Sequence, residues 1–176
     1  MKSALSFVVL LAGLLAVKAQ QYHPVDEKSE VRFTVKNFGL NTEGSLVGLK
    51  GSIKFNPSDL STSSFDVSVD VNSINTGIDS RDSHIKKEDY FDVGRYPTVN
   101  FVSTGISQNQ NDYAVTGKLT IKGITKTISF PFTVQNQDNG LLLTGSFIIN
   151  RKDFNIGESS AVLGNTVNVS LKVFAK

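Results

Sequence analysis

Four consecutive residues, Arg81, Asp82, Ser83 and His84, have side chains of the types that do chemistry. A serine beside a histidine would be typical of a nucleophile with its general base. Their segment favours a helix, however, and neighbours on a helix point in different directions, so this spacing does not bring Ser83 and His84 together. A catalytic triad is recognised by its geometry, and no other sequence context here supports one. We therefore predict that the protein is not an enzyme.

The sequence also offers few of the side chains that bind metal ions. The chain has two histidines, His23 and His84, and no cysteine, so the usual ligands of a zinc or redox-metal site are missing. Without cysteine, no disulfide supports the fold either. We therefore predict no metal and no cofactor, in a domain that its apolar core alone must stabilise.

Outside this polar segment the chain alternates apolar and polar residues with the period of two that is typical of half-buried β-strands. Short turn sequences separate the runs, and Asp138-Asn139-Gly140 is the sharpest hairpin signal. Connections this short exclude parallel crossovers, so the sheet should be antiparallel. We predict an all-β fold, an eight-stranded antiparallel β-barrel whose closure removes exposed edges. The clearest strands are centred on residues 31–35, 65–71, 113–121, 128–134, 141–149 and 167–173, and less regular ones are expected over 46–55 and 98–106.

Two segments interrupt the alternation, residues 79–93 and 151–163, and each is expected to cap or gate an end of the barrel. The first is a short helical insert between strands, in which Asp82 and Lys86 are four residues apart and can pair on one helical face. Arg81, Asp82 and His84 are thereby expected at the barrel mouth, where two interpretations stay open. Arg81 and Asp82 either fix the insert to the barrel by hydrogen bonds or contact the head group of a ligand.

The first nineteen residues are predicted to be a cleaved signal peptide. A short positive start precedes an apolar run from Ala4 to Val17, and Val17-Lys18-Ala19 offers small residues for cleavage. The run is shorter than the roughly 20 apolar residues that span a bilayer. We therefore expect residues 20–176 to form one mature domain, periplasmic or secreted, with no transmembrane segment.

Cleavage after residue 19 would also balance the charge. It removes Lys2 and Lys18 and leaves 16 basic and 16 acidic side chains. Like charges form no long block, so the chain lacks the electrostatic footprint of proteins that bind nucleic acid or anionic membranes. We predict no nucleic-acid partner.

Several short motifs follow one another in a fixed order along the predicted mature part of the chain. They are Ser73-Ile74-Asn75-Thr76-Gly77, Arg81-Asp82-Ser83-His84, Phe91-Asp92, Pro97-Thr98-Val99-Asn100-Phe101, the run from Gly117 to Lys126, and Arg151-Lys152-Asp153-Phe154. With these motifs the chain resembles the YceI family across nearly all of its predicted mature part, although Lys28 and Asn37 stand at two positions where that family often has histidine. The resemblance implies a lipocalin-like β-barrel of an exported protein that binds isoprenoid-type lipids.

The same resemblance implies a function, namely binding, and transport or storage, of a long apolar isoprenoid-type lipid inside the barrel in the periplasm. The alternative is a non-catalytic structural or stress-related interaction barrel with a filled core, which the alternation by itself favours. The candidate ligand-binding residues are apolar strand residues: Phe33, Val35, Phe55, Val67, Val69, Phe101, Leu119, Ile121, Phe130, Phe132, Phe147 and Val169.

Overall fold

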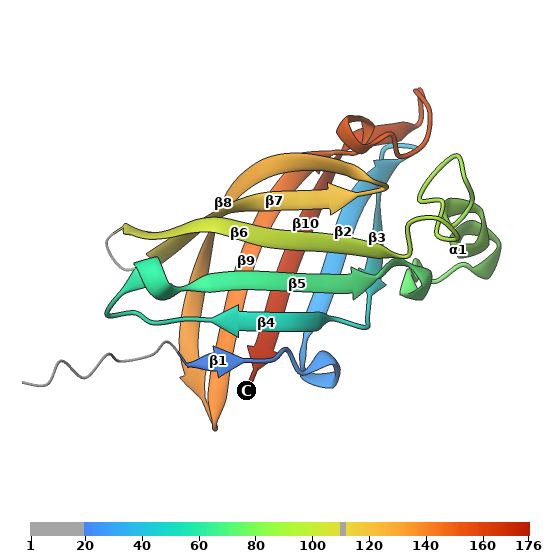
Figure 1. The fold of residues 1–176 in the computed structure, drawn as a ribbon. Helices are drawn as coiled ribbons and strands as arrows, with labels where there is room; N and C mark the ends of the chain where they lie inside the picture. The colour runs from blue at the N-terminus through green and yellow to red at the C-terminus, as the bar shows by residue number, and fades with distance from the viewer. Residues whose placement is uncertain (1–19, 110–111) are drawn as a thin grey trace, which may run out of the picture.

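The computed structural model describes residues 20–109 and 112–176, and the predicted signal peptide lies outside the described residues. One antiparallel sheet of ten strands curls back on itself, with a short α-helix at one end (Figure 1). No helix in this part of the chain is long and apolar enough to cross a membrane. The strands are β1 (Gln21–Tyr22), β2 (Glu30–Asn37), β3 (Leu40–Leu46), β4 (Lys50–Lys54), β5 (Ser64–Asp70), β6 (Thr98–Asn109), β7 (Asp112–Ile121), β8 (Ile124–Gln137), β9 (Gly140–Asn150) and β10 (Leu163–Ala175); the helices are η1 (Asp26–Lys28), η2 (Leu60–Thr62), η3 (Val71–Ser73), α1 (Asp79–Ile85) and η4 (Arg151–Phe154).

The strand order is β1-β4-β5-β6-β7-β8-β9-β10-β2-β3, and every strand pair is antiparallel, as predicted. The all-β class is confirmed, but the predicted count of eight strands is wrong. The stretch 46–55 is the end of β3, a turn and then β4. Sequence patterning missed most of β3 because its middle residues are polar, so the strand shows no apolar alternation.

The sheet also does not close by strand pairing as predicted. β1 and β3 stand at the two ends of the strand order, and among the described residues they do not pair with each other. Loops cover part of the gap instead. Ser45 of β3 and Asn75 exchange two backbone hydrogen bonds of 2.9 and 3.0 Å. A curled sheet whose edge is covered by a loop meets the same need as a closed barrel, because paired backbone groups cannot recruit another chain.

Two-residue turns join β2 to β3, β7 to β8 and β8 to β9, and they set the register of these pairs. The predicted hairpin at Asp138-Asn139-Gly140 is confirmed, with Asp138 at a φ of 49° between β8 and β9. The turn between β2 and β3 consists of Phe38 and Gly39, at φ values of 50° and 77°. Positive φ at both central positions is the mark of hairpin turns whose twist matches that of the strands.

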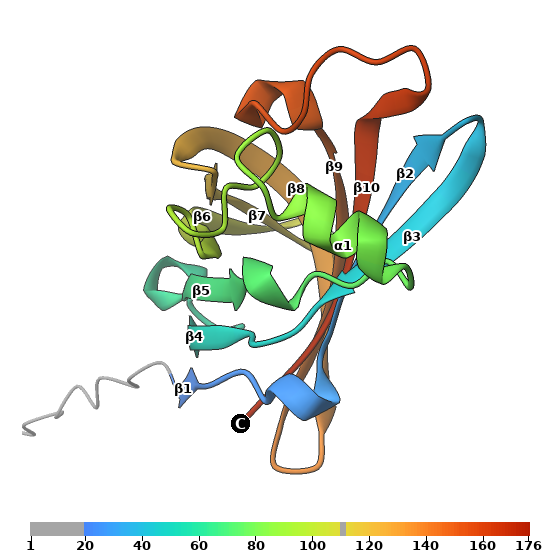
Figure 2. The same ribbon diagram turned by 90° about the vertical axis from the view of Figure 1, so that its right-hand side faces the viewer.

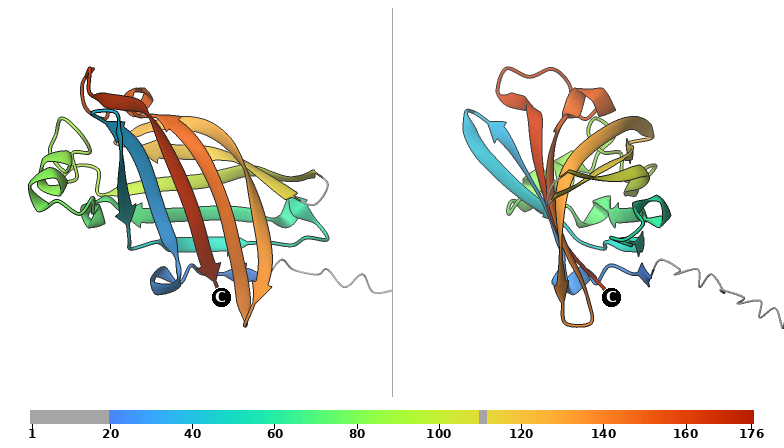
Figure 3. Two further views of the ribbon diagram at one scale, coloured as in Figure 1. Left: turned by 180° about the vertical axis from the view of Figure 1, so that it is seen from behind. Right: turned by 90° about the vertical axis from the view of Figure 1, so that its left-hand side faces the viewer.

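The curled sheet forms two walls that face each other. Strands β4 to β7 make one wall, and β9, β10, β2 and β3 make the other, with α1 at one end of the space between them (Figure 2). Seen from behind, the second wall runs obliquely across the first (Figure 3).

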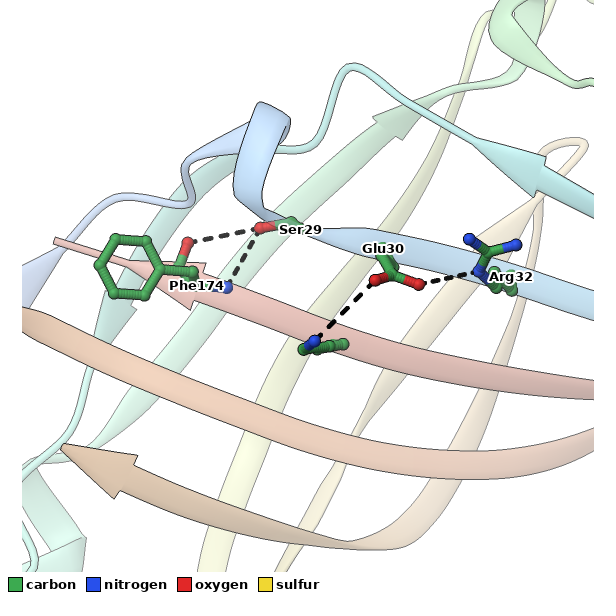
Figure 4. Close-up of polar contacts among 5 residues, drawn as sticks. Ser29, Glu30, Arg32 and Phe174 are labelled. Atoms are coloured by element: carbon green, nitrogen blue, oxygen red, sulfur yellow. Dashed lines mark hydrogen bonds and ion pairs between the residues drawn. The ribbon is translucent and has the colours of Figure 1, made fainter. Parts of the chain in front are cut away.

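Polar contacts on the second wall tie β2 to β10 (Figure 4). The backbone N–H of Phe174 donates to the Ser29 hydroxyl at 3.1 Å, and that hydroxyl donates to the carbonyl of Val25 at 2.8 Å. Farther along, Glu30 accepts from Arg32 at 2.9 Å and lies 4.0 Å from the ammonium of Lys172. The hydrogen bond from Arg32, and then its charge, lower the pKa of Glu30. These charged groups are exposed, so they fix geometry more than they stabilise the fold.

Candidate functional site: an apolar cavity between the walls

The space between the two walls is a cavity of about 480 Å³. Its volume lies within the range of roughly 300–1,000 Å³ that is usual for small-molecule sites. Both walls contribute side chains, and most of the lining is apolar. Part of the interior of this fold is therefore hollow, beside clusters of buried side chains that pack against one another.

Eleven of the twelve candidate residues from the sequence lie on this lining. They come from β2, β5, β6, β7, β8, β9 and β10, so all but three of the ten strands present at least one of them. Alternation explains the agreement, because residues two apart on a strand share a face. The lining residues are Phe33, Val35, Val67, Val69, Phe101, Leu119, Ile121, Phe130, Phe132, Phe147 and Val169.

Phe55 is the exception, because it does not line the cavity. It is buried beyond the end of β4, where its ring meets Tyr113 edge-on at 5.0 Å and Phe132 at 6.2 Å. Phe132 in turn packs against Phe65 at 5.3 Å, and these last two rings do line the cavity. Phe55 and Tyr113 thus lie behind the lining rings, and the end of β4 and the start of β7 bring this aromatic cluster to the end of the sheet that lies away from α1 (Figure 1).

The other end of the cavity, called the mouth from here on, is lined by the two segments that interrupt the strands. The α1 segment contributes Thr76, Arg81, His84 and several apolar residues. The segment between β9 and β10 contributes others, among them Ile156. The prediction that these segments cover an end of the sheet is therefore consistent with the structure, and both gather at the same end (Figure 1).

The structure separates the two roles that sequence left open for Arg81 and Asp82. Asp82 is buried, and its Oδ1 accepts hydrogen bonds from the backbone N–H of Thr76 at 2.9 Å and from the Thr76 hydroxyl at 2.6 Å. The carboxylate therefore holds the helix to the loop before it. The pairing of Asp82 with Lys86 that their spacing allows is not among the ion pairs of the described residues. Arg81 lines the cavity, and among the described residues its guanidinium makes no hydrogen bond or ion pair. Asp82 is placed to anchor the insert, and Arg81 is placed to meet whatever enters the mouth.

Arg151 organises the second mouth segment. Its guanidinium is 3% exposed and donates to four backbone carbonyls, those of Ile156 at 2.7 Å, Glu158 at 2.9 Å, Gly164 at 3.0 Å and Leu163 at 3.2 Å. A buried cation is tolerated only when its donors are satisfied, and here carbonyl dipoles satisfy them. The motif that begins at Arg151 is thus a structural device that shapes the loop beside the cavity.

Sequence reasoning missed the lining residues that do not lie on strands. Apolar side chains such as Tyr90, Phe91 and Ile156 reach the cavity from irregular segments. The period-two pattern cannot find such residues, because it applies only to strands. Their signal was the presence of large apolar side chains inside segments that are otherwise polar.

The geometry at the mouth does not assemble a nucleophile with a base. Ser83 is exposed and is not part of the lining, whereas the His84 ring packs against Tyr90 with centroids 5.1 Å apart. Within residues 20–109 and 112–176, no group of three or more histidine, aspartate or glutamate side chains could hold a metal ion. What the cavity offers is apolar surface, with the Arg81 guanidinium at its mouth, for which the described part of the chain supplies no hydrogen bond or ion pair.

Comparison with known proteins agrees with this description. The family model of the YceI-like domain matches residues 22–175. The UPF0312 protein of Yersinia enterocolitica is 28% identical over 152 residues, covering 81% of this chain and 78% of the relative. The UPF0312 protein of Pseudomonas paraeruginosa is 26% identical, covering 97% of this chain and 93% of the relative.

Solved structures share the fold. BcnA of Burkholderia cenocepacia superposes with a TM-score of 0.83 at 30% identity, covering 87% of this chain and 99% of BcnA. A polyisoprenoid binding domain from Saccharophagus degradans, implicated in plant cell wall breakdown, superposes with a TM-score of 0.71 at 18% identity, covering 88% of this chain and 97% of that domain. The second likeness is one of fold alone.

Proposed function

Because this chain belongs to the YceI family, we propose that its cavity binds a long apolar lipid of the isoprenoid type. The observation that carries the proposal is the hollow of about 480 Å³ between two walls of apolar side chains. A polyisoprenoid binding domain of the same fold supports the choice of ligand class. The site lacks a catalytic constellation, so we propose binding and not catalysis.

The hydrophobic effect is large enough to retain such a ligand. Each methylene group that leaves water contributes about 0.8 kcal/mol, so a chain of about 20 buried methylenes contributes about 16 kcal/mol before costs. Association costs about 4–15 kcal/mol in lost freedom. A lipid could therefore be held with few polar contacts, which is what an apolar lining with a polar mouth provides.

The ligand is proposed to enter with its apolar end toward the aromatic cluster and its polar end at the mouth. Phe132 and Phe65 line the end of the cavity beside that cluster, where a polar group would lose its hydrogen bonds to water. Arg81, His84 and Thr76 line the open end, where a head group could accept hydrogen bonds and remain close to water.

The biological setting is part of the proposal. We place the protein in the periplasm or outside the cell because residues 1–19 have the pattern of a cleavable signal peptide. A protein that shields an apolar chain from water there would transport or store its lipid between membranes.

Native mass spectrometry of protein purified without detergent tests the proposal. We expect a fraction of the protein to carry extra mass, which organic extraction should release as a long-chain lipid. A bare mass, combined with no uptake of added polyprenol or polyprenyl phosphate, would contradict lipid binding. That result would leave a structural or interaction protein whose cavity has no lipid function.

A further inference from the structure

Several large apolar side chains are exposed on the segments that border the mouth, and three of them lie on two adjoining segments. Phe38 and Leu40 are each 74% exposed at the tip of the hairpin between β2 and β3, and Val162 is 40% exposed just before β10. A backbone hydrogen bond of 2.9 Å from Phe38 to the carbonyl of Val162 joins the two segments. We call these three residues the apolar rim. Single exposed apolar residues are ordinary, but a group of three on adjoining segments is a feature that marks interaction sites.

Phe38 is also an unfavourable choice for its backbone. It occupies the first central position of a two-residue turn at a φ of 50°, where asparagine, aspartate or glycine is preferred. Among the described non-glycine residues with positive φ, the other four are Asp92, Lys122, Asp138 and Asn155, all polar. A bulky residue in the left-handed region is an outlier that folding does not call for. Burial does not explain a ring that is 74% exposed at this φ, and backbone outliers of this kind gather at functional positions.

The rim is continuous with the cavity. Val162 is itself part of the cavity lining, and Leu40 is the register partner of Asn37, which also lines the cavity. An apolar chain that leaves the cavity at this point would pass over apolar side chains before it reaches water. The rim thus extends the cavity's surface to the outside of the protein.

The charges around the rim argue against electrostatic attraction. Segments 36–43 and 155–164 carry one basic side chain, Lys36, and two acidic ones, Glu43 and Glu158, all of them exposed. Proteins that bind anionic surfaces through charge gather several basic residues near the contact. A neutral contact of this composition fits an uncharged or zwitterionic lipid surface, into whose interfacial layer apolar side chains can insert.

We propose that the apolar rim docks the protein on a lipid bilayer, with Phe38 and Leu40 inserted among the lipids and the mouth facing the membrane. The inference rests on the proposed function, because docking there would let a lipid move between bilayer and cavity without crossing water. The rim attaches the protein to the bilayer, and the cavity receives the lipid that leaves it.

Flotation with phosphatidylcholine vesicles tests the docking. The test variant is the double substitution Phe38→Asn and Leu40→Thr, in which asparagine suits the left-handed turn and threonine suits the strand. The matched control is Ile148→Thr, because Ile148 is 65% exposed but lies on β9 outside the cavity lining. We expect the wild type and Ile148→Thr to float with the vesicles. The double variant should bind the vesicles about tenfold more weakly, because two large apolar side chains no longer leave water on binding. Circular dichroism melts should show that all three proteins are folded.

The same experiment separates the alternatives. Binding of the wild type should persist at about 0.5 M NaCl, because screening weakens only charge-driven contacts; loss of binding at high salt would overturn insertion. Equal flotation of the double variant, or no flotation of the wild type, would also overturn the proposal. The proposal would also be overturned if sedimentation showed that the wild type is a dimer and the double variant is a monomer, since the rim would then be an interface between two copies. Native mass spectrometry distinguishes the failure of this proposal from the failure of the proposed function. Protein that carries lipid but never floats would refute the docking and leave the lipid binding intact. Protein that floats with vesicles but never carries lipid would refute the lipid binding and leave the docking intact.

Discussion

Replacing Asp82 by alanine should destabilise the domain, whereas replacing its neighbour Arg81 should not. The structure gives Asp82 an anchoring role, because one carboxylate oxygen accepts both the N–H and the hydroxyl of Thr76. Arg81 has its side chain on the cavity lining. Two consecutive residues are therefore predicted to respond differently to the same change.

The magnitude follows from the two hydrogen bonds. A hydrogen bond to a charged group contributes about 1.5–3 kcal/mol when the group is buried. Asp82 is 9% exposed, but Thr76 is only half-buried, so water can partly replace the carboxylate as its partner. We therefore expect Asp82→Ala to lower the free energy of unfolding by about 2 kcal/mol, less than the roughly 3–6 kcal/mol that two such bonds would contribute if both partners were fully buried. For a domain of this size, that loss corresponds to a fall in Tm of about 4–8 °C.

Denaturant unfolding of the wild type, four single variants and one double variant measures the effect and its origin. Asp82→Asn keeps an acceptor oxygen and should lose about half as much stability as Asp82→Ala. Thr76→Val removes the hydroxyl and keeps the N–H donor. In a double-mutant cycle, Thr76→Val and Asp82→Ala should show a coupling energy of about 1 kcal/mol, because they share one of the two bonds. Arg81→Ala should stay within about 0.5 kcal/mol of the wild type while it weakens binding of a lipid with a polar head group.

The reasoning is refuted if Asp82→Ala unfolds like the wild type, since the two bonds to Thr76 would then not stabilise the domain. Equal destabilisation by Arg81→Ala would be as damaging, because it would show that both residues anchor the insert.

Three further predictions follow from the cavity, the mouth and the N-terminus. Val69→Trp should fill the cavity and abolish lipid uptake with little loss of stability, whereas Val102→Trp on the outer surface should leave uptake unchanged. If Val69→Trp instead loses about 1–3 kcal/mol of stability in a denaturant melt, the side chains around Val69 form a packed core. Arg151→Met should lower the free energy of unfolding by about 3 kcal/mol or more, because four backbone carbonyls lose their charged donor. A denaturant melt within experimental error of the wild type would show that the loop keeps its shape without the Arg151 guanidinium. N-terminal sequencing of exported protein should find a new end within a few residues of Ala19, and an intact Met1 on the exported form would disprove cleavage.

Much of the fold could be predicted from local pattern. A strand places residues i and i+2 on one face, so the alternation around Phe33, Val69 and Leu119 was enough to group side chains that do share the cavity. Turn chemistry was equally local, because Asp138-Asn139-Gly140 suits a two-residue hairpin turn in any fold. The polar strand β3 escaped because its residues carry no such alternation and it is recognised only by its pairing with β2.

Alternation along the chain is sufficient to assign which residues share a strand face, and with them the all-β class and the antiparallel order. Whether those faces meet or leave a space becomes visible only in the folded molecule, because the distance between two walls depends on strand curvature and on every facing side chain. The folded structure places Phe55 behind the cavity lining, brings Asp82 within hydrogen-bond distance of Thr76, and places Arg81 at the mouth. Those roles depend on contacts between a side chain and groups from other elements, and a pattern read along one chain contains no such distances.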